Sequence, residues 1–147
     1  MTGELVRLPV PRVRFLDLPH VLEAHARVLL QHGGADGVRD EKLLHSALAQ
    51  PRQTFGGEYL HSSLHAQAAA YVFHISQNQP FNDGNKRTGL VCGITFLSKN
   101  KLFMFQGGDE LADAIYAVAG GKADKRTLTE IFRRHALPSP MLTRDRS

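Results

Sequence analysis

The chain has 147 residues and a mass of 16.3 kDa; 42% of its residues are hydrophobic and 22% are charged. This length suits one domain, which would bury about two thirds of the surface of the unfolded chain. The composition excludes a disordered protein and a membrane protein, because apolar residues are plentiful but never form a run of the ~18 that a membrane helix needs. The single cysteine, Cys92, excludes an internal disulfide. Since residues 1–15 lack the apolar run of a secretory signal, we expect a cytosolic protein.

The net charge of +4 comes entirely from the C-terminal part of the chain. Lys and Arg balance Asp and Glu over residues 1–120, so the excess of positive charge lies in residues 121–147. A basic end of this kind is usually a solvated helix face followed by a frayed terminus. Nucleic-acid binding through these residues is the weaker interpretation, and it predicts an affinity that falls steeply with salt.

The N-terminal part of the chain changes from an extended to a helical pattern. Residues 1–12 lack helical periodicity and contain two prolines, which predicts an extended arm, and residues 13–16 have the pattern of a short edge strand. Apolar residues then recur at helical spacing, which predicts a helix over residues 18–32 with Asp17 as its N-cap and Gly33 at its end.

The rest of the chain predicts more helices and a small hairpin. Asp40 is placed to cap a second helix that ends before Pro51, and residues 52–63 read as a loop or hairpin. In the helix that follows residue 84, Gly89 and Gly93 would allow a close approach of a neighbouring backbone. The pattern therefore predicts a compact all-α domain of six or more helices over residues 13–136, with a tail over residues 137–147. The other predicted helices span about 64–78, 85–100, 109–119 and 127–135, and a short apolar strand spans 102–105.

Polar, glycine and basic residues crowd the start of the helix that follows Pro80. A helix N-terminus attracts anions, Gly84 lets the backbone approach closely, and Lys86 and Arg87 are suited to bind a phosphate chain. Asp83 could hold a Mg²⁺ ion that bridges phosphate oxygens, and Asn85 could position both phosphate and loop. The same residues also suit an ordinary turn with a solvated first helical turn, and their spacing alone leaves both interpretations open.

The segment from Gln79 to Arg87 resembles the signature of the Fic/Doc family. That signature carries a histidine, a phenylalanine, an acidic residue, a small residue, an asparagine and an arginine in this order, and here Phe81, Asp83, Gly84 and Asn85 fill the inner positions. The resemblance extends over about residues 13–135, through the first helix, the glycine-containing loop near residue 56 and the alanine-rich helix before the motif. It is closest to the Doc branch.

The resemblance implies a transferase that uses ATP and Mg²⁺. Fic proteins generally transfer AMP to a hydroxyl side chain of a target protein, whereas the Doc protein is a toxin that phosphorylates a threonine of elongation factor Tu. By resemblance, Asp83 takes Mg²⁺, Asp83, Asn85 and Arg87 are catalytic, and the phosphates bind to Gly84, Asn85, Lys86 and Arg87. Lys86 and an apolar Leu90 favour phosphoryl transfer, while Gly84 is the form typical of the Fic branch.

The resemblance also implies a target-binding flap and a protein inhibitor. The flap would hold a target segment beside the site. A glutamate-containing inhibitory helix, which many Fic proteins have, is not matched by residues 54–58, so a separate antitoxin protein is expected to cover the site. The flap residues are Thr54, Phe55, Gly56, Gly57, Glu58, Tyr59 and Leu60.

Gln79 occupies the position of the family's general base. An amide has no useful pKa, and general-base catalysis contributes about 10²–10⁴ in rate, so the chain as sequenced should be inactive or impaired. Either the glutamine is natural and the activity is lost or altered, or it was introduced so that a toxic protein could be produced; retention of the other motif residues favours the second. A catalytically silent module that binds a nucleotide or a partner is the alternative function.

No other histidine is expected to replace the missing base. His74 lies more than a helical turn before the loop, and His25 falls near the apolar face of the first helix, where a core role is the simpler interpretation. His61 and His65 have the spacing of a metal pair but lack a third ligand, which favours a surface or flap role.

Overall fold

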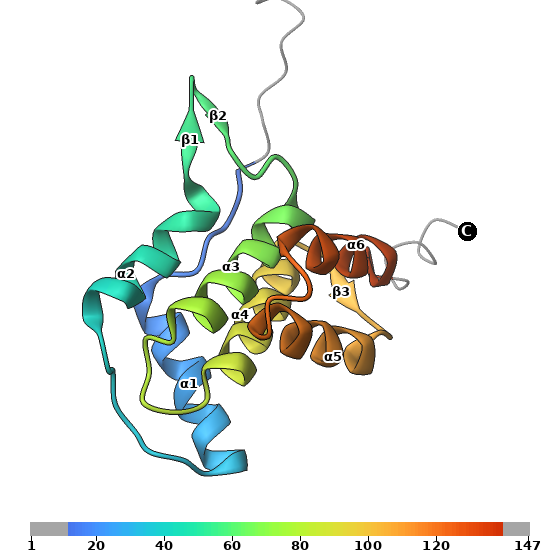
Figure 1. Cartoon of the computed structure of the whole chain (residues 1–147). Coiled ribbons are helices and arrows are strands. Elements are labelled where there is room, and N and C mark those ends of the chain that lie inside the picture. Colours follow the sequence, from blue (N-terminus) through green and yellow to red (C-terminus); the bar gives the residue numbers. More distant parts are fainter. Residues whose placement is uncertain (1–11, 140–147) are drawn as a thin grey trace, which may run out of the picture.

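In the computed structural model, which describes residues 12–139, six α-helices pack around one core (Figure 1). The predicted all-α fold with a small hairpin is confirmed. A single 3₁₀ turn, η2 (Gln50–Arg52), leads into that hairpin, which is formed by β1 (Thr54–Phe55) and β2 (Glu58–Tyr59). The helices are α1 (Leu18–His32), α2 (Glu41–Ala49), α3 (Leu64–Asn78), α4 (Asn85–Lys99), α5 (Gly108–Ala119) and α6 (Lys125–His135).

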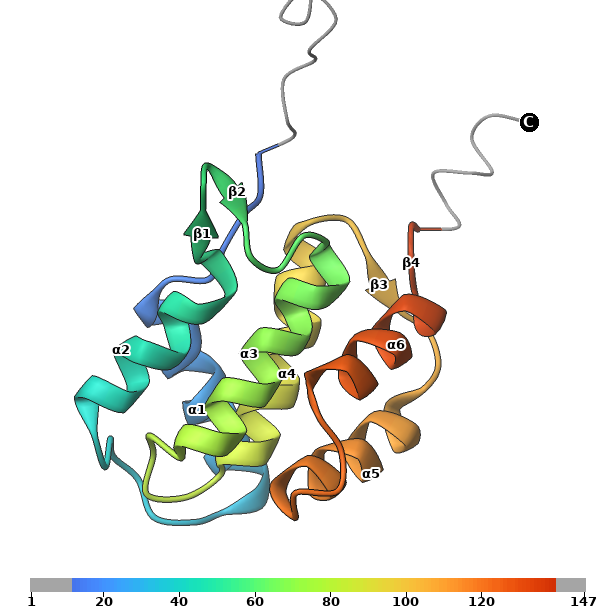
Figure 2. The same ribbon diagram turned by 45° about the horizontal axis from the view of Figure 1, so that its top comes forward.

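The centre of the fold is the pair formed by α3 and α4. Helices α1 and α2 cover one side of this pair, and α5 and α6 cover the other (Figures 1 and 2). The glycines of α4 allow the close approach that the sequence predicts: a Cβ atom on Gly93 would lie 2.6 Å from Cγ2 of Val72, and one on Gly89 would lie 3.0 Å from the Val72 carbonyl oxygen. The backbones of α3 and α4 therefore pack directly against each other at these glycines. The largest fully buried side chains of the core are Tyr71, Phe81, Phe96, Phe132, Leu16 and Leu44.

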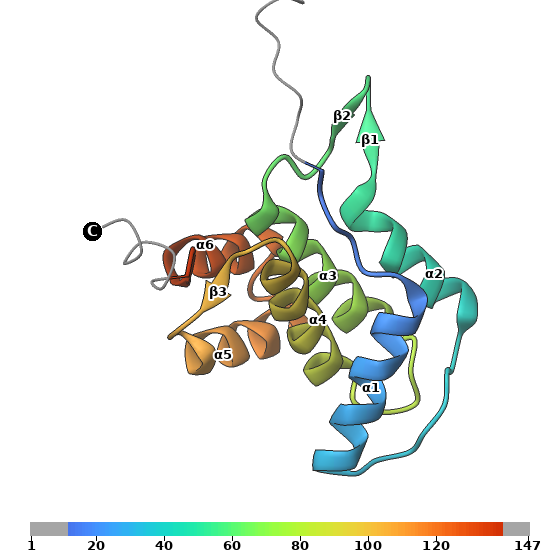
Figure 3. The same cartoon turned by 180° about the vertical axis from the view of Figure 1, so that it is seen from behind.

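The segment before α1 is extended but is not the edge strand that the sequence predicts for residues 13–16. Its backbone binds side chains in place of a neighbouring strand. The amide of Leu16 donates to the hydroxyl of Tyr71 at 2.8 Å, and the amide of Arg14 donates to Oδ1 of Asn100 at 2.9 Å. Burial raises the pKa of Tyr71 to about 12, so this hydroxyl stays protonated and remains a constant anchor. Figure 3 shows the segment from behind, leading down to α1.

Capping side chains explain the starts of three of the six described helices. The side chains of Asp40, Ser63 and Asp124 accept hydrogen bonds from the first turns of α2, α3 and α6. The cap at Asp124 starts α6 two residues before the predicted boundary. No helix in the described part of the chain has the length and apolar character needed to cross a membrane.

A second small sheet joins the region between α4 and α5 to the end of α6. The strand predicted over residues 102–105 is present as β3 (Phe103–Met104), and it pairs antiparallel with β4 (Ala136–Leu137). Leu137, which the sequence assigned to the tail, thus belongs to a strand. The rest of that tail from residue 140, and the predicted arm up to residue 11, lie outside the described residues.

Candidate active site

The motif loop (residues 79–84), between α3 and α4, is held along its length by the bracing loop (residues 33–40), between α1 and α2. Val38 and Phe81 form an isolated antiparallel bridge between the two loops. The hydrogen bonds between the two loops join backbone atoms, so they fix the path of the motif loop independently of its side chains. The amides of Arg39 and Asp40 donate to the carbonyl of Pro80 at 2.7 and 3.1 Å, and the amide of Asn82 donates to the carbonyl of Gly37 at 3.0 Å.

Gln79 ends α3 in a left-handed backbone conformation, with φ of 48° and ψ of 57°. Arg39 fixes this conformation from the bracing loop. Its Nε donates to the carbonyl of Gln79 at 2.8 Å, and its Nη2 donates to the carbonyl of Asn78 at 3.0 Å. The guanidinium therefore satisfies carbonyls that the end of the helix leaves unpaired and holds residue 79 at the edge of the site. No local sequence pattern predicts this role of Arg39.

Phe81 is buried and anchors the motif loop in the core, and His25 packs against its ring. The ring of His25 stacks on Phe81 at a centroid distance of 3.8 Å and an angle of 9°. Nε2 of His25 lies 2.8 Å from the carbonyl oxygen of Asp83. Since a carbonyl can only accept, Nε2 carries the proton. His25 is thus the buried, hydrogen-bonded histidine that the sequence predicts, and its partner is the loop itself.

Asn85 uses its whole side-chain amide on the motif loop. Its Oδ1 accepts from the amide of Phe81 at 2.9 Å, and its Nδ2 donates to the carbonyl of Phe81 at 3.0 Å. The sequence suggested that this side chain positions both phosphate and loop, and the structure shows it bound to the loop. Asn85 also offers a ligand its backbone amide at the start of α4.

Asp83 presents an exposed carboxylate that is already oriented. Its Oδ2 accepts a hydrogen bond from the amide of Ala35 at 2.6 Å. Within the described residues, no group of three or more His, Cys, Asp and Glu side chains could hold a metal ion by itself. A Mg²⁺ ion commonly takes one or two carboxylates and completes its shell with phosphate oxygens and water, so this site fits Mg²⁺ only together with a phosphate ligand.

The N-terminus of α4 has no side-chain cap, a feature that it shares with α5. Gly84 is the N-cap residue, with a left-handed φ of 79°, and no side chain caps the first turn, in contrast to α2, α3 and α6. The amides of that turn point to the positive end of the helix dipole. Lys86 and Arg87 follow at once, and neither forms a salt bridge with another described residue. This arrangement favours an anion.

The motif residues meet in one pocket of about 300 Å³, which we call the motif pocket. Tyr116, from α5, is the lining residue that sequence reasoning missed. The Nζ atom of Lys86 lies 5.8 Å from the centre of its ring. Its signal in the sequence is weak: Tyr116 falls outside the apolar stripe of α5 and is 66% exposed. The other lining residues are Gln79, Asn82, Asp83, Gly84, Asn85, Lys86 and Arg87.

The hairpin (residues 54–60) does not reach the motif pocket. It lies at the N-terminal end of α3, whereas the motif loop lies at the C-terminal end (Figure 1). A helix of 15 residues spans about 22 Å, which separates the two regions. The flap expected beside the site is thus placed away from it, because α3 connects the hairpin to the motif loop without a turn.

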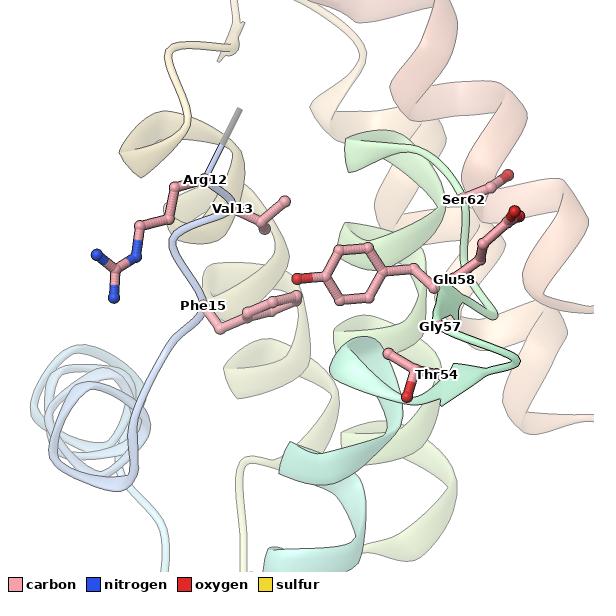
Figure 4. A pocket seen from close by; sticks show the side chains of 8 residues that line it. Arg12, Val13, Phe15, Thr54, Gly57, Glu58 and Ser62 are labelled. Atoms are coloured by element: carbon pink, nitrogen blue, oxygen red, sulfur yellow. The ribbon is translucent and has the colours of Figure 1, made fainter. Parts of the chain in front are cut away.

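A second pocket, of about 620 Å³, lies between the hairpin and the segment before α1; we call it the hairpin pocket (Figure 4). Phe15 contacts Tyr59 edge to face at a centroid distance of 5.6 Å, and this pair forms its apolar floor. Phe55, on the hairpin, is 81% exposed. The other lining residues are Arg12, Val13, Thr54, Gly57, Glu58 and Ser62.

The histidines at residues 61, 65 and 74 do not replace the base at residue 79. Nζ of Lys125 donates to Nε2 of His74 at 3.0 Å and to Nε2 of His61 at 3.1 Å. Burial and the Lys125 ammonium lower the pKa of His74 to about 4, so this imidazole is neutral at pH 7. His65 lies 3.3 Å from the carbonyl of Ala136. The bond between His74 and Lys125 joins α3 to α6, and none of the three histidines lines the motif pocket.

Comparison with known proteins agrees with this geometry. Residues 15–97 match the model of the Fic/DOC family, and the chain belongs to this family. It is 37% identical over 86 residues to the Toxin Doc of Mycolicibacterium smegmatis, a match that covers 58% of this chain and 64% of that protein. It is 25% identical over 122 residues to the Protein kinase doc of Escherichia phage P1, covering 83% of this chain and 95% of that protein. The predicted family is confirmed.

Proposed function

We propose that this chain is a Doc-like toxin whose motif pocket transfers a phosphoryl group from ATP to a hydroxyl side chain of a protein. The observation that carries the proposal is the meeting of an uncapped helix N-terminus with Lys86, Arg87 and Asp83 in one pocket. The names of two relatives, a toxin and a protein kinase, support this class of activity.

In this proposal the chain acts mainly by binding and orienting charge. The phosphates of ATP lie against the first-turn amides of α4, with Lys86 and Arg87 neutralising their oxygens. Asp83 holds Mg²⁺, which supplies further positive charge at the phosphates. The target hydroxyl oxygen forms a bond to the γ-phosphorus while the bond to the β,γ-bridging oxygen breaks, so that ADP leaves with the electron pair.

The proton of the target hydroxyl finds no base at residue 79 of the chain as sequenced. Gln79 lines the pocket at the position where the family has its base, but a neutral amide cannot take up a proton at physiological pH. We therefore expect Gln79→His to raise the transfer rate by about 10²–10⁴. The backbone suits this change, because histidine is more common than most residues in left-handed conformations like that of residue 79.

The deciding experiment uses ATP labelled on one phosphate at a time. The chain and its Gln79→His variant are incubated with Mg²⁺, labelled ATP and either purified elongation factor Tu or a cell lysate. Label transferred from the γ-phosphate supports phosphorylation, and label from the α-phosphate means AMP transfer. No transfer of either label by the histidine variant would contradict the proposal. Labelling of a lysate protein other than elongation factor Tu would change the target but keep the reaction.

A catalytically silent module is the second candidate, and the absence of a base at Gln79 favours it. Such a protein would bind ATP or a partner protein without transferring a group. Calorimetry and the labelled-ATP assay together separate the two candidates. ATP binding by the chain and by Gln79→His, with no transfer of label by either, would establish the silent module.

A toxin also needs a means of control. We propose that a separate antitoxin protein covers the site and that the toxin acts in the cytosol, where elongation factor Tu is found. Expression of Gln79→His is expected to arrest bacterial growth, whereas the chain as sequenced should be tolerated. Growth arrest by both forms to the same degree would contradict the role assigned to residue 79.

A further inference from the structure

One aromatic ring borders a pocket that is otherwise polar. Seven of the eight residues that line the motif pocket come from residues 79–87, and each of these is polar, charged or glycine. The eighth, Tyr116, is the one aromatic residue among the described residues that line it. A ligand with phosphates at the start of α4 would therefore find a flat apolar surface only at Tyr116.

The position of this ring is fixed by the packing of α5. Leu111, Ile115 and Val118 are buried and form the face of α5 that packs against the core. Nε2 of Gln77 donates to the carbonyl of Val118 at 2.9 Å. This bond ties the last turn of α5 to the last turn of α3, directly before the motif loop, and so holds Tyr116 beside the pocket.

The ring itself is exposed at the border of the pocket. Tyr116 is 66% exposed, so its aromatic surface remains in water in the unliganded chain. The Lys86 ammonium lies 5.8 Å from the ring centre, close to the limit of a cation–π contact. When a phosphate of a nucleotide binds to Lys86, the base of the same nucleotide can thus reach the ring of Tyr116.

We propose that Tyr116 is the platform on which the base of the bound nucleoside triphosphate stacks. This rests on the proposed function, because it adds a base subsite to the phosphate site at α4. Every nucleobase has a π face, and an open ring stacks on each of them without reading its edge. We therefore expect ATP and GTP to bind with similar affinity, and both to bind more tightly than inorganic tripolyphosphate, which has no base.

The experiment compares ATP with tripolyphosphate by calorimetry in the presence of Mg²⁺. It uses the chain as sequenced, Tyr116→Ala, Tyr116→Phe and Lys86→Ala. Tyr116→Ala is expected to weaken ATP binding about tenfold and to leave tripolyphosphate binding unchanged, since stacking acts on the base alone. Tyr116→Phe keeps the ring and should bind ATP like the parent chain. Lys86→Ala should weaken both ligands.

The outcomes separate this proposal from the proposed function. If the chain binds tripolyphosphate and Tyr116→Ala leaves ATP affinity unchanged, stacking is overturned while the phosphate site stands. Equal losses for ATP and tripolyphosphate in Tyr116→Ala would also overturn stacking, because the tyrosine would then act by supporting Lys86. If the chain binds neither ligand, both proposals fail together.

A fluorescent variant gives an independent measurement. The chain has no tryptophan, so Tyr116→Trp introduces a single indole at the platform. Stacking of a base on the indole should quench its fluorescence when ATP is added, and tripolyphosphate should leave it unquenched. Quenching by ATP and tripolyphosphate to the same degree would contradict a base platform. Because residue 116 is exposed, all three variants at this position should fold. Circular dichroism with thermal melting verifies this.

Discussion

The two ends of α3 are built in opposite ways. At its C-terminal end, the motif loop is bonded to the bracing loop by backbone amides, by Arg39 and by the amide of Ala35. At its N-terminal end, the hairpin extends from the body of the protein, and Phe55 is 81% exposed there (Figure 1). One end is thus held before any ligand binds, whereas the other offers apolar surface to the outside.

This difference indicates that the two ends of α3 have different functions. A pocket that neutralises phosphate charge is most effective when its dipoles are already oriented, because no reorganisation is then needed during the reaction. An exposed hairpin with apolar side chains is typical of a surface that contacts another protein. The comparison therefore predicts that changes at the motif end affect nucleotide binding and stability, and that changes at the hairpin affect neither.

The largest expected effect is at Arg87. Arg87→Ala removes a forked donor next to the proposed phosphates and should weaken ATP binding about tenfold or more. The matched control is Arg126→Ala, which removes the same charge from an exposed position at the start of α6. Calorimetry with ATP and Mg²⁺ measures both. Equal losses of ATP affinity in the two variants would show that Arg87 contributes only to the net charge of the chain and does not bind the phosphates.

The next effect concerns the clamp at Arg39. Arg39→Ala removes the two side-chain hydrogen bonds to the end of α3, and we expect a loss of about 1–2 kcal/mol in the free energy of unfolding. In the Gln79→His background, the transfer rate should fall as well, because residue 79 is no longer held. Urea denaturation and the labelled-ATP assay measure the two effects.

Arg27→Ala is the control for the clamp. Arg27 pairs with Glu23 at 3.5 Å on the exposed face of α1, a contact typically worth about 0.3–0.5 kcal/mol. If Arg39→Ala is no more destabilising than Arg27→Ala and leaves the transfer rate unchanged, the motif loop does not depend on this clamp.

Acid should weaken the cluster formed by His61, His74 and Lys125. Burial and Lys125 lower the pKa of His74 from 6.5 to about 4, so between these values the unfolded chain binds a proton that the folded chain does not. Protonation of the unfolded chain therefore lowers the free energy of unfolding as the pH falls from about 6.5 to about 4. Since the side chain is only partly buried, we expect a decrease of about 1–2 kcal/mol after solvent screening.

Denaturation at several pH values tests this expectation, with His74→Gln as the control. The control removes the titrating group and should flatten the pH dependence below pH 6.5. Burial and Lys125 also lower the pKa of His61, so part of the slope should remain. Because His61 follows the hairpin, hydrogen exchange should increase there before it increases in the motif loop. Identical pH profiles for the chain and His74→Gln would contradict the assignment.

The smallest expected effect is at the tip of the hairpin. Phe55→Ser should change the free energy of unfolding by less than about 0.5 kcal/mol, because the side chain is exposed. ATP affinity should also stay the same, since the hairpin does not line the motif pocket. In the Gln79→His background, weaker labelling of the protein target would show that the hairpin contacts the target. A loss of ATP affinity would contradict the separation of the two ends.

The sequence by itself determined the helices and the chemistry of the motif. Apolar spacing and capping residues such as Asp40 act within a few positions, so the helix boundaries follow from local patterns. The close approach at the glycines of α4 was predictable for the same reason. The basic and acidic residues of the motif lie within nine positions of one another, which ensures that they share one pocket.

Only the tertiary structure decided what surrounds the motif. Arg39 and His25 reach the loop from 40 and 58 positions away, and Tyr116 enters the pocket from α5. The packing of the helices creates these contacts, and no local pattern encodes them. Packing also decided where the hairpin lies, because α3, a helix about 22 Å long, separates it from the site beside which the resemblance placed it.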